Sequence, residues 1–133
     1  MFVPLLRAYP AFSTNYESFV REYGPDADQL PNYILLTDLA MECIRLFRDG
    51  RLGEVTRILD VVEQWLIAGE TYVRDAAIVG FLEDLQNTNL NDGASPDRFF
   101  ELLGPEAKYW WARVERLWAD GSPIIDDRDK KVL

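Results

Sequence analysis

The chain has 133 residues, of which 48% are hydrophobic and 28% charged, so we expect one globular domain over residues 1–133 with a sizeable core. Its formal net charge is −9, from 23 acidic and 14 basic residues, which argues against binding to a nucleic-acid backbone and favours basic protein partners. It contains no histidine, which excludes the commonest general base and the commonest metal ligand.

The N-terminal part predicts two helices. The segment VPLLRAY forms a short helix with Pro4 in its first turn, and STNYESFVREY forms a second helix that ends before Gly24. Thr14 and Glu17 in this second helix have the spacing of a capping box. The first residues do not resemble a secretion signal, and no apolar run approaches the ~18 residues of a membrane span. We therefore expect a cytoplasmic protein that does not bind membranes.

Three long helices are predicted next, over residues 32–49, 54–68 and 72–87. The turns between them are short, so consecutive helices should pack as antiparallel neighbours. The third helix carries apolar residues in almost every direction and is expected to be buried as the central rod of the fold. Gly80 in its interior is unfavourable for a helix and is best explained as a point where another helix crosses closely.

After an Asn-rich loop at 87–96, the sequence predicts a short helix at 96–104 and a last long helix at 105–120. Trp110, Trp111 and Trp118 lie on the apolar stripe of that helix, so we expect them to pack in the core. The remaining residues have no helical period, and we expect 121–133 to form a flexible tail or to lie against the body. The predicted fold is all-α, a compact array of about five to seven helices in antiparallel hairpins with orthogonal or HEAT-like packing. A regular four-helix bundle is the alternative.

Candidate chemistry is sparse. Cys43 falls on the apolar face of its helix and is expected to be a buried packing residue. Glu83 and Asp84 are adjacent, so their side chains diverge by about 100° and cannot act as a convergent pair. We expect them to pair with arginines such as Arg74, Arg113 or Arg116, or to cap backbone groups.

The loop from Asn87 to Gly93 superficially resembles a calcium site. Counting from Asn87, the sixth position is Asp92 where such loops have glycine, and the twelfth is Arg98 where they have glutamate. The sequence therefore predicts no metal and no cofactor.

Acidic side chains gather on two helices, and an aromatic pair near the C-terminus is predicted to have a partly exposed edge. On the helix over residues 32–49, Arg45 interrupts the acidic stripe. On the helix over residues 54–68, Glu63 is expected among the exposed acidic residues. The predicted partner-binding residues are Asp38, Glu42, Asp49, Glu54, Asp60, Tyr109 and Trp110.

The segments NYILLTDLA, VVEQWLIAGETYVRDAAIVGFLEDLQN and LGPEAKYWWARVERLW together resemble a group of small, acidic, all-helical bacterial proteins. Some of these look like immunity proteins of contact-dependent or other polymorphic toxin systems. The resemblance covers residues 31–118, and its motifs belong to the core. It implies that the protein binds and neutralises a cognate toxin domain, such as a nuclease, in the cytoplasm and has no catalytic activity of its own.

Two other functions remain open. One is a helical adaptor or assembly protein that uses Tyr109 and Trp110 to hold a partner or, as a homodimer, a second copy of itself. The other is an enzyme that holds Mg²⁺ with carboxylates such as Glu42, Glu83 and Asp84. This enzyme hypothesis requires those carboxylates to converge in one pocket.

Overall fold

The computed structural model describes residues 2–24, 33–87, 97–126 and 128. Every regular element in these ranges is a helix, and they contain no strand, so the predicted all-α fold is confirmed. The elements are α1 (Val3–Ala8), η1 (Pro10–Phe12), α2 (Ser13–Tyr23), α3 (Tyr33–Arg48), α4 (Leu52–Ala68), α5 (Thr71–Ala76), η3 (Ala77–Leu82), α6 (Glu83–Gln86), α7 (Asp97–Phe100) and α8 (Pro105–Asp120).

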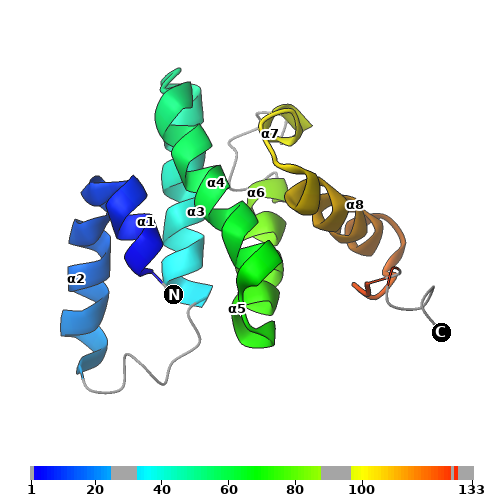
Figure 1. Ribbon diagram of the computed structural model, residues 1–133, viewed down its shortest axis with the longest axis horizontal. Helices are drawn as coiled ribbons and strands as arrows, with labels where there is room; N and C mark the ends of the chain where they lie inside the picture. The colour runs from blue at the N-terminus through cyan, green and yellow to red at the C-terminus, as the bar shows by residue number, and fades with distance from the viewer. Residues whose placement is uncertain (1, 25–32, 88–96, 127, 129–133) are drawn as a thin grey trace.

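The helices are arranged in a row that begins with α2 and ends with α8 (Figure 1). Helix α3 runs in one direction, α4 returns beside it, and the continuous rod of α5, η3 and α6 reverses again, so the predicted antiparallel order of the three long helices is confirmed (Figure 1). Helix α4 is central, because it contacts α1, α3, α5, η3 and α8.

The start of α2 differs from the prediction. No side chain caps this helix, so the capping box proposed for Thr14 and Glu17 is wrong. The physical reason is that the chain enters α2 directly from the 3-10 turn η1, and Phe12 at the junction already has helical angles, φ −71° and ψ −11°. A capping side chain needs an extended backbone at that position to reach back to the first turn.

The rod of α5, η3 and α6 contains a π-helix over Ala77–Leu82 where an ordinary α-helix was expected. It packs across α3, and Gly80 lies at the crossing, as predicted. A Cβ atom on Gly80 would be 2.8 Å from Cδ1 of Tyr33 and 3.0 Å from Cδ1 of Leu36. The rod is not buried on all sides, since Val79 is 43% exposed.

The tryptophans of α8 do not all belong to the core. Trp110 and Trp111 are buried, whereas Trp118 is 54% exposed, so its predicted core position is wrong. The last turns of α8 extend beyond the helices on which its first half packs, and the neighbouring Glu115 and Ala119 are exposed as well (Figure 1). Helical periodicity gives the side of a helix that an apolar residue occupies, but not where the supporting surface ends.

Glu63 is also placed differently from the prediction. This residue of α4 is 7% exposed, and its carboxylate accepts hydrogen bonds from the backbone N–H groups of Glu106, at 2.6 Å, and Ala107, at 3.0 Å. These groups belong to the first turn of α8, where backbone donors have no partner within the helix and the helix dipole favours a negative charge. Glu63 therefore connects α4 with α8, two helices far apart in the sequence, and is not part of an acidic surface.

Candidate functional site

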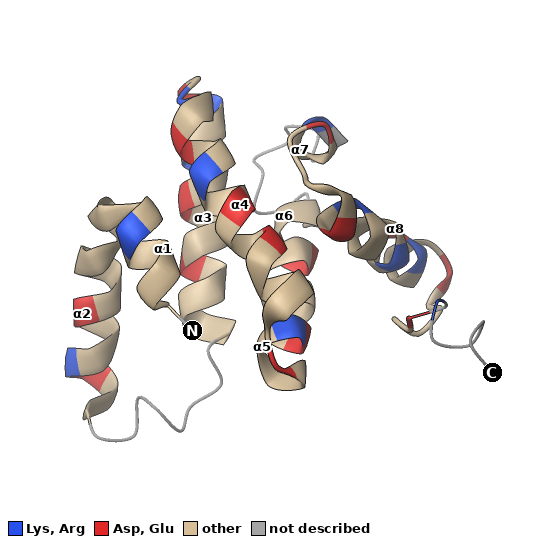
Figure 2. Ribbon diagram, viewed as in Figure 1, with Lys and Arg blue, Asp and Glu red and all other residues tan. Residues whose placement is uncertain are grey.

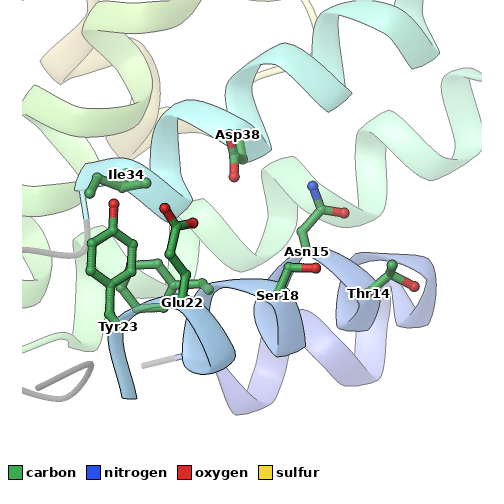
Figure 3. Close-up of a pocket in the computed structure, with 8 residues that line it drawn as sticks. Thr14, Asn15, Ser18, Glu22, Tyr23, Ile34 and Asp38 are labelled. Atoms are coloured by element: carbon green, nitrogen blue, oxygen red, sulfur yellow. The ribbon is translucent and has the colours of Figure 1, made fainter. Parts of the chain in front are cut away.

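A groove of about 210 Å³ lies between α2 and the first half of α3 (Figure 3). Polar side chains of α2 point across it toward α3, and Asp38 points back toward α2 (Figure 3). The groove is lined by Thr14, Asn15, Ser18, Phe19, Glu22, Tyr23, Ile34 and Asp38. It is smaller than the roughly 300–1,000 Å³ of small-molecule sites, and its size suits one or two inserted side chains.

The charge of the groove is negative and uncompensated. Asp38 and Glu22 both line it, and neither forms an ion pair with another described residue. Asp38 is half-buried, and this burial raises the pKa of its carboxyl group. A cationic side chain in the groove would give Asp38 the opposite charge that the described residues do not supply.

Exposed apolar side chains continue from the groove along α3. Ile34 is 44% exposed and Met41 is 51% exposed, and their spacing of seven residues places them on the same side of the helix. Tyr33, at the start of α3, is 38% exposed. A negative groove beside apolar side chains has the mixed character of a protein interface.

Two carboxylates of the acidic stripe predicted on α3 share an ion pair with its own arginine. Arg45 forms ion pairs with Glu42 and, at 3.3 Å, with Asp49. Glu42 also accepts a hydrogen bond of 2.7 Å from the hydroxyl of Tyr9. The hydrogen bond from Arg45 lowers the pKa of Glu42, while burial, followed by the bond to Glu42, raises the pKa of Tyr9 to about 12. Of this stripe, only Asp38 belongs to the groove.

The two acids predicted on α4 lie outside the groove. Glu54 is half-buried and forms an ion pair with Arg51 on the preceding turn of the chain. Asp60 is exposed. Both signs of charge are visible on α2, α4 and α8, so acidic and basic residues are interspersed along these helices (Figure 2).

The aromatic pair on α8, predicted to have a partly exposed edge, is partly exposed only at Tyr109. Trp110 is 3% exposed, so this part of the prediction is wrong. Tyr109 is half-buried, and the guanidinium carbons of Arg113 and Arg128 lie 3.6 and 3.8 Å from the centroid of its ring. The two side chains are adjacent on the helix, and burial of Trp110 against the core leaves Tyr109 at its margin, where the arginines cover it.

The carboxylates considered for catalysis are not brought together. Asp84 accepts a hydrogen bond of 2.7 Å from the hydroxyl of Thr37, whereas Glu42 faces Tyr9. Thr37 and Glu42 are five residues apart on α3, so their side chains leave the helix about 140° apart. No group of acidic or sulfur side chains among the described residues is arranged to hold a metal ion.

Glu83 and Asp84 do not pair with Arg74, Arg113 or Arg116 as predicted. Thr37 is the partner of Asp84, and the carboxylate of Glu83 forms no hydrogen bond or ion pair with the part of the chain that is described. Burial raises the pKa of both carboxyl groups, and the neighbouring charge of Asp84 adds to the effect on Glu83. Arg74 is directed elsewhere: its Nε lies 3.7 Å from Oδ1 of Asp75, and its guanidinium carbon is 5.6 Å from the ring centroid of Trp110.

Cys43 is fully buried, as predicted, and its thiol is packed in the core cluster. Burial, with a smaller contribution from the charge of Glu42, raises the pKa of this thiol far above its usual range. It therefore has no thiolate for nucleophilic chemistry. The Asn-rich loop considered for calcium lies outside the described residues apart from Asn87.

The model of one protein family, described as a domain of unknown function (DUF7674), matches residues 2–119. The chain belongs to this family. The match includes both helices that form the groove and all but the last residue of α8. No curated protein and no solved structure matches the chain. Within the residues that the structure describes, this protein has no helix that is long and apolar enough to cross a membrane.

Of the residues that line the groove, the sequence predicted only Asp38 as a binding residue. The spacing of the others nevertheless shows a pattern. Asn15, Ser18 and Glu22 are spaced by three and four residues, which places three polar side chains on one face of α2. Ile34 and Asp38 have the same spacing on α3. A polar face on one helix does not reveal that a second helix will lie opposite it, because that depends on tertiary packing.

Proposed function

We propose that this protein acts by binding a basic partner protein through the groove between α2 and α3, and that the partner is a bacterial toxin domain which the bound protein neutralises. The observation that carries the proposal is that one groove of 210 Å³ holds two carboxylates, Glu22 and Asp38, that form no ion pair with a described residue. A lysine or arginine from the partner would enter the groove and pair with them.

The surroundings of the groove favour a protein as the ligand. The exposed side chains of Ile34 and Met41 provide apolar area beside the charged groove. Protein interfaces combine such an apolar centre with charged groups that set orientation and increase the association rate. A nucleic acid is disfavoured, because the carboxylates of the groove would repel its phosphates.

Neutralisation of a toxin requires binding and no chemistry in the inhibitor. This agrees with the separation of Glu42 from Asp84 and with the burial of Cys43. Nuclease domains carry basic surfaces to hold phosphates, so an inhibitor of net charge −9 is electrostatically matched to them. The resemblance of the core segments to immunity proteins of polymorphic toxin systems supports the same function.

Co-expression with the protein encoded immediately upstream tests the proposal. We expect the upstream protein alone to stop growth, this protein to restore it, and the two to co-purify with equal stoichiometry. If this protein neither restores growth nor co-purifies, the proposed function is wrong.

A charge-matched pair of variants tests the groove itself. Glu22→Gln with Asp38→Asn removes two negative charges from the groove, and we expect it to weaken protection and co-purification. Glu101→Gln with Glu115→Gln removes two exposed negative charges elsewhere and should leave both unchanged. Equal loss in the two double variants would indicate an effect of net charge and would contradict a specific role for the groove.

A further inference from the structure

The first half of α8 carries a second cluster of interactions, centred on Arg128. The two terminal nitrogens of this arginine donate to the carboxylate of Glu106, at 2.9 and 2.7 Å. Its Nε and one terminal nitrogen donate to Asp126, at 2.9 and 3.1 Å. The guanidinium carbon lies 3.8 Å from the ring centroid of Tyr109 and 5.8 Å from that of Trp110.

The groups on α8 that hold Arg128 are themselves positioned by other contacts. Trp110 donates from Nε1 to Glu106 at 3.3 Å, and the hydroxyl of Tyr109 donates to Asp126 at 2.8 Å. Trp110 is buried, so its ring is held by the core. Glu106 belongs to the turn of α8 whose backbone is fixed by Glu63. A carboxylate in bidentate geometry beside an aromatic ring recognises a guanidinium group, and it recognises an ammonium group less well.

We propose that Glu106, Tyr109 and Trp110 form a binding site for an arginine side chain of the basic partner, and that Arg128 occupies this site as an internal competitor. The inference rests on the proposed function only in assigning the arginine to that partner. The segment that brings Arg128 to the site, residues 122–126, contains no helix. Two of its residues contact the helices: Ile124 is half-buried against the core, and Asp126 accepts a hydrogen bond from the hydroxyl of Tyr109.

Displacement of this segment would leave Glu106 without the bidentate partner that it has in the structure. The hydrogen bonds from Arg128 chiefly lower the pKa of Glu106, and a guanidinium group from a partner in the same position would favour the charged carboxylate in the same way. Because Arg128 is attached to the same chain, its effective concentration at the site is high, in the millimolar range for a short flexible connection. A partner's arginine must therefore compete with Arg128, and loss of Arg128 should strengthen binding at this site.

The experiment uses full-length Arg128→Ala and the unaltered protein, each titrated with N-acetyl-arginine amide or N-acetyl-lysine amide. The readout is the NMR resonance of the Trp110 indole N–H, which reports on its hydrogen bond to Glu106. We expect the arginine amide to shift this resonance saturably in Arg128→Ala, at least tenfold more tightly than in the unaltered protein or with the lysine amide. Adding Glu106→Gln to Arg128→Ala should abolish the shift.

No saturable shift in Arg128→Ala, or equal affinities for the arginine and lysine amides, would show that Arg128 only anchors the C-terminal segment and would overturn the proposal. Retention of the native amide spectrum in Arg128→Ala shows that the fold is intact. Because no partner protein is present in this titration, its failure leaves the function of the α2–α3 groove unaffected, and failure of co-expression leaves the arginine site to be judged by the titration.

Discussion

The carboxylate of Glu63 lies against the backbone of Gly104, in the space that a side chain at position 104 would occupy. A Cβ atom on Gly104 would lie 2.5 Å from Cδ of Glu63. Gly104 has an extended backbone, with φ −72°, so the glycine is required for space and not for an unusual conformation. This close approach lets the carboxylate of Glu63 reach the first backbone N–H groups of α8.

Glu63→Gln should destabilise the protein by about 1–3 kcal/mol, because the amide cannot accept from both backbone donors as the carboxylate does and leaves a buried N–H group unsatisfied. The free energy of unfolding in urea is the measurement. Asp60→Asn on the exposed side of the same helix is the control and should change it by less than about 0.5 kcal/mol. Equal effects of the two changes would contradict the capping role.

Gly104→Ala should also destabilise the protein, because its methyl group displaces Glu63 from the helix end. Its effect should be smaller in a Glu63→Ala background, where the clash is absent. A double-mutant cycle measures this coupling, which we expect to be about 1 kcal/mol or more for residues in such contact. Additive effects would mean that Gly104 is needed for another reason.

Two glycines, one at the crossing of α3 and the π-helix and one in open space, test how closely these helices pack. Gly80→Ala should destabilise the protein by about 1–3 kcal/mol, because the added methyl group meets Tyr33 and Leu36. Gly53→Ala, in the first turn of α4 with open space around it, should be neutral or stabilising by up to about 1 kcal/mol. Thermal unfolding of both variants tests this, and a stabilising Gly80→Ala would refute the close crossing.

Because of its burial and its contact with Glu42, the hydroxyl group of Tyr9 should lose its proton at a higher pH than an ordinary tyrosine. The pKa of Tyr9 is raised from 10.0 to about 12, so its contribution to stability is fully present below pH 10 and is lost as the pH rises toward about 12. Tyrosinate absorbance against pH should show this late step, and Tyr9→Phe should remove it. If Tyr9→Phe instead removes a tyrosine that titrates near pH 10, the buried contact is not present in solution.

Cys43 should be protected from chemical modification. Because its thiol is buried and its pKa is raised, a thiol reagent should react only with the unfolded molecules present at equilibrium. The rate of modification should therefore follow the unfolded fraction as urea is added. Reaction in native buffer at the rate of a free thiol would show that the core around Cys43 opens without unfolding.

The sequence predicted the helices and their antiparallel order well, because apolar periodicity and short turns are local features. It also predicted the crossing at Gly80, since glycine is unfavourable inside a helix unless space demands it. It failed where a residue is defined by a distant partner. Glu63 was read as a surface acid because α8 begins 42 residues later, and the groove was missed because its two walls come from separate helices.

The sequence also could not predict which carboxylates form ion pairs. Asp38, Glu42 and Asp49 look equivalent in the sequence, yet Arg45 pairs with Glu42 and Asp49, whereas Asp38 lines the groove. Which carboxylates an arginine will pair with depends on side-chain geometry that spacing alone only restricts.

We propose Glu22 and Asp38 as the docking site for a basic partner. The most direct measurement is the Kd of the purified upstream protein for three forms of this protein: the unaltered chain, Glu22→Gln with Asp38→Asn, and Glu101→Gln with Glu115→Gln. We predict that the groove variant binds about tenfold or more weakly, a loss of about 1.4 kcal/mol or more, while the control variant binds like the unaltered chain. Equal affinity of the groove variant and the unaltered chain would contradict the claim.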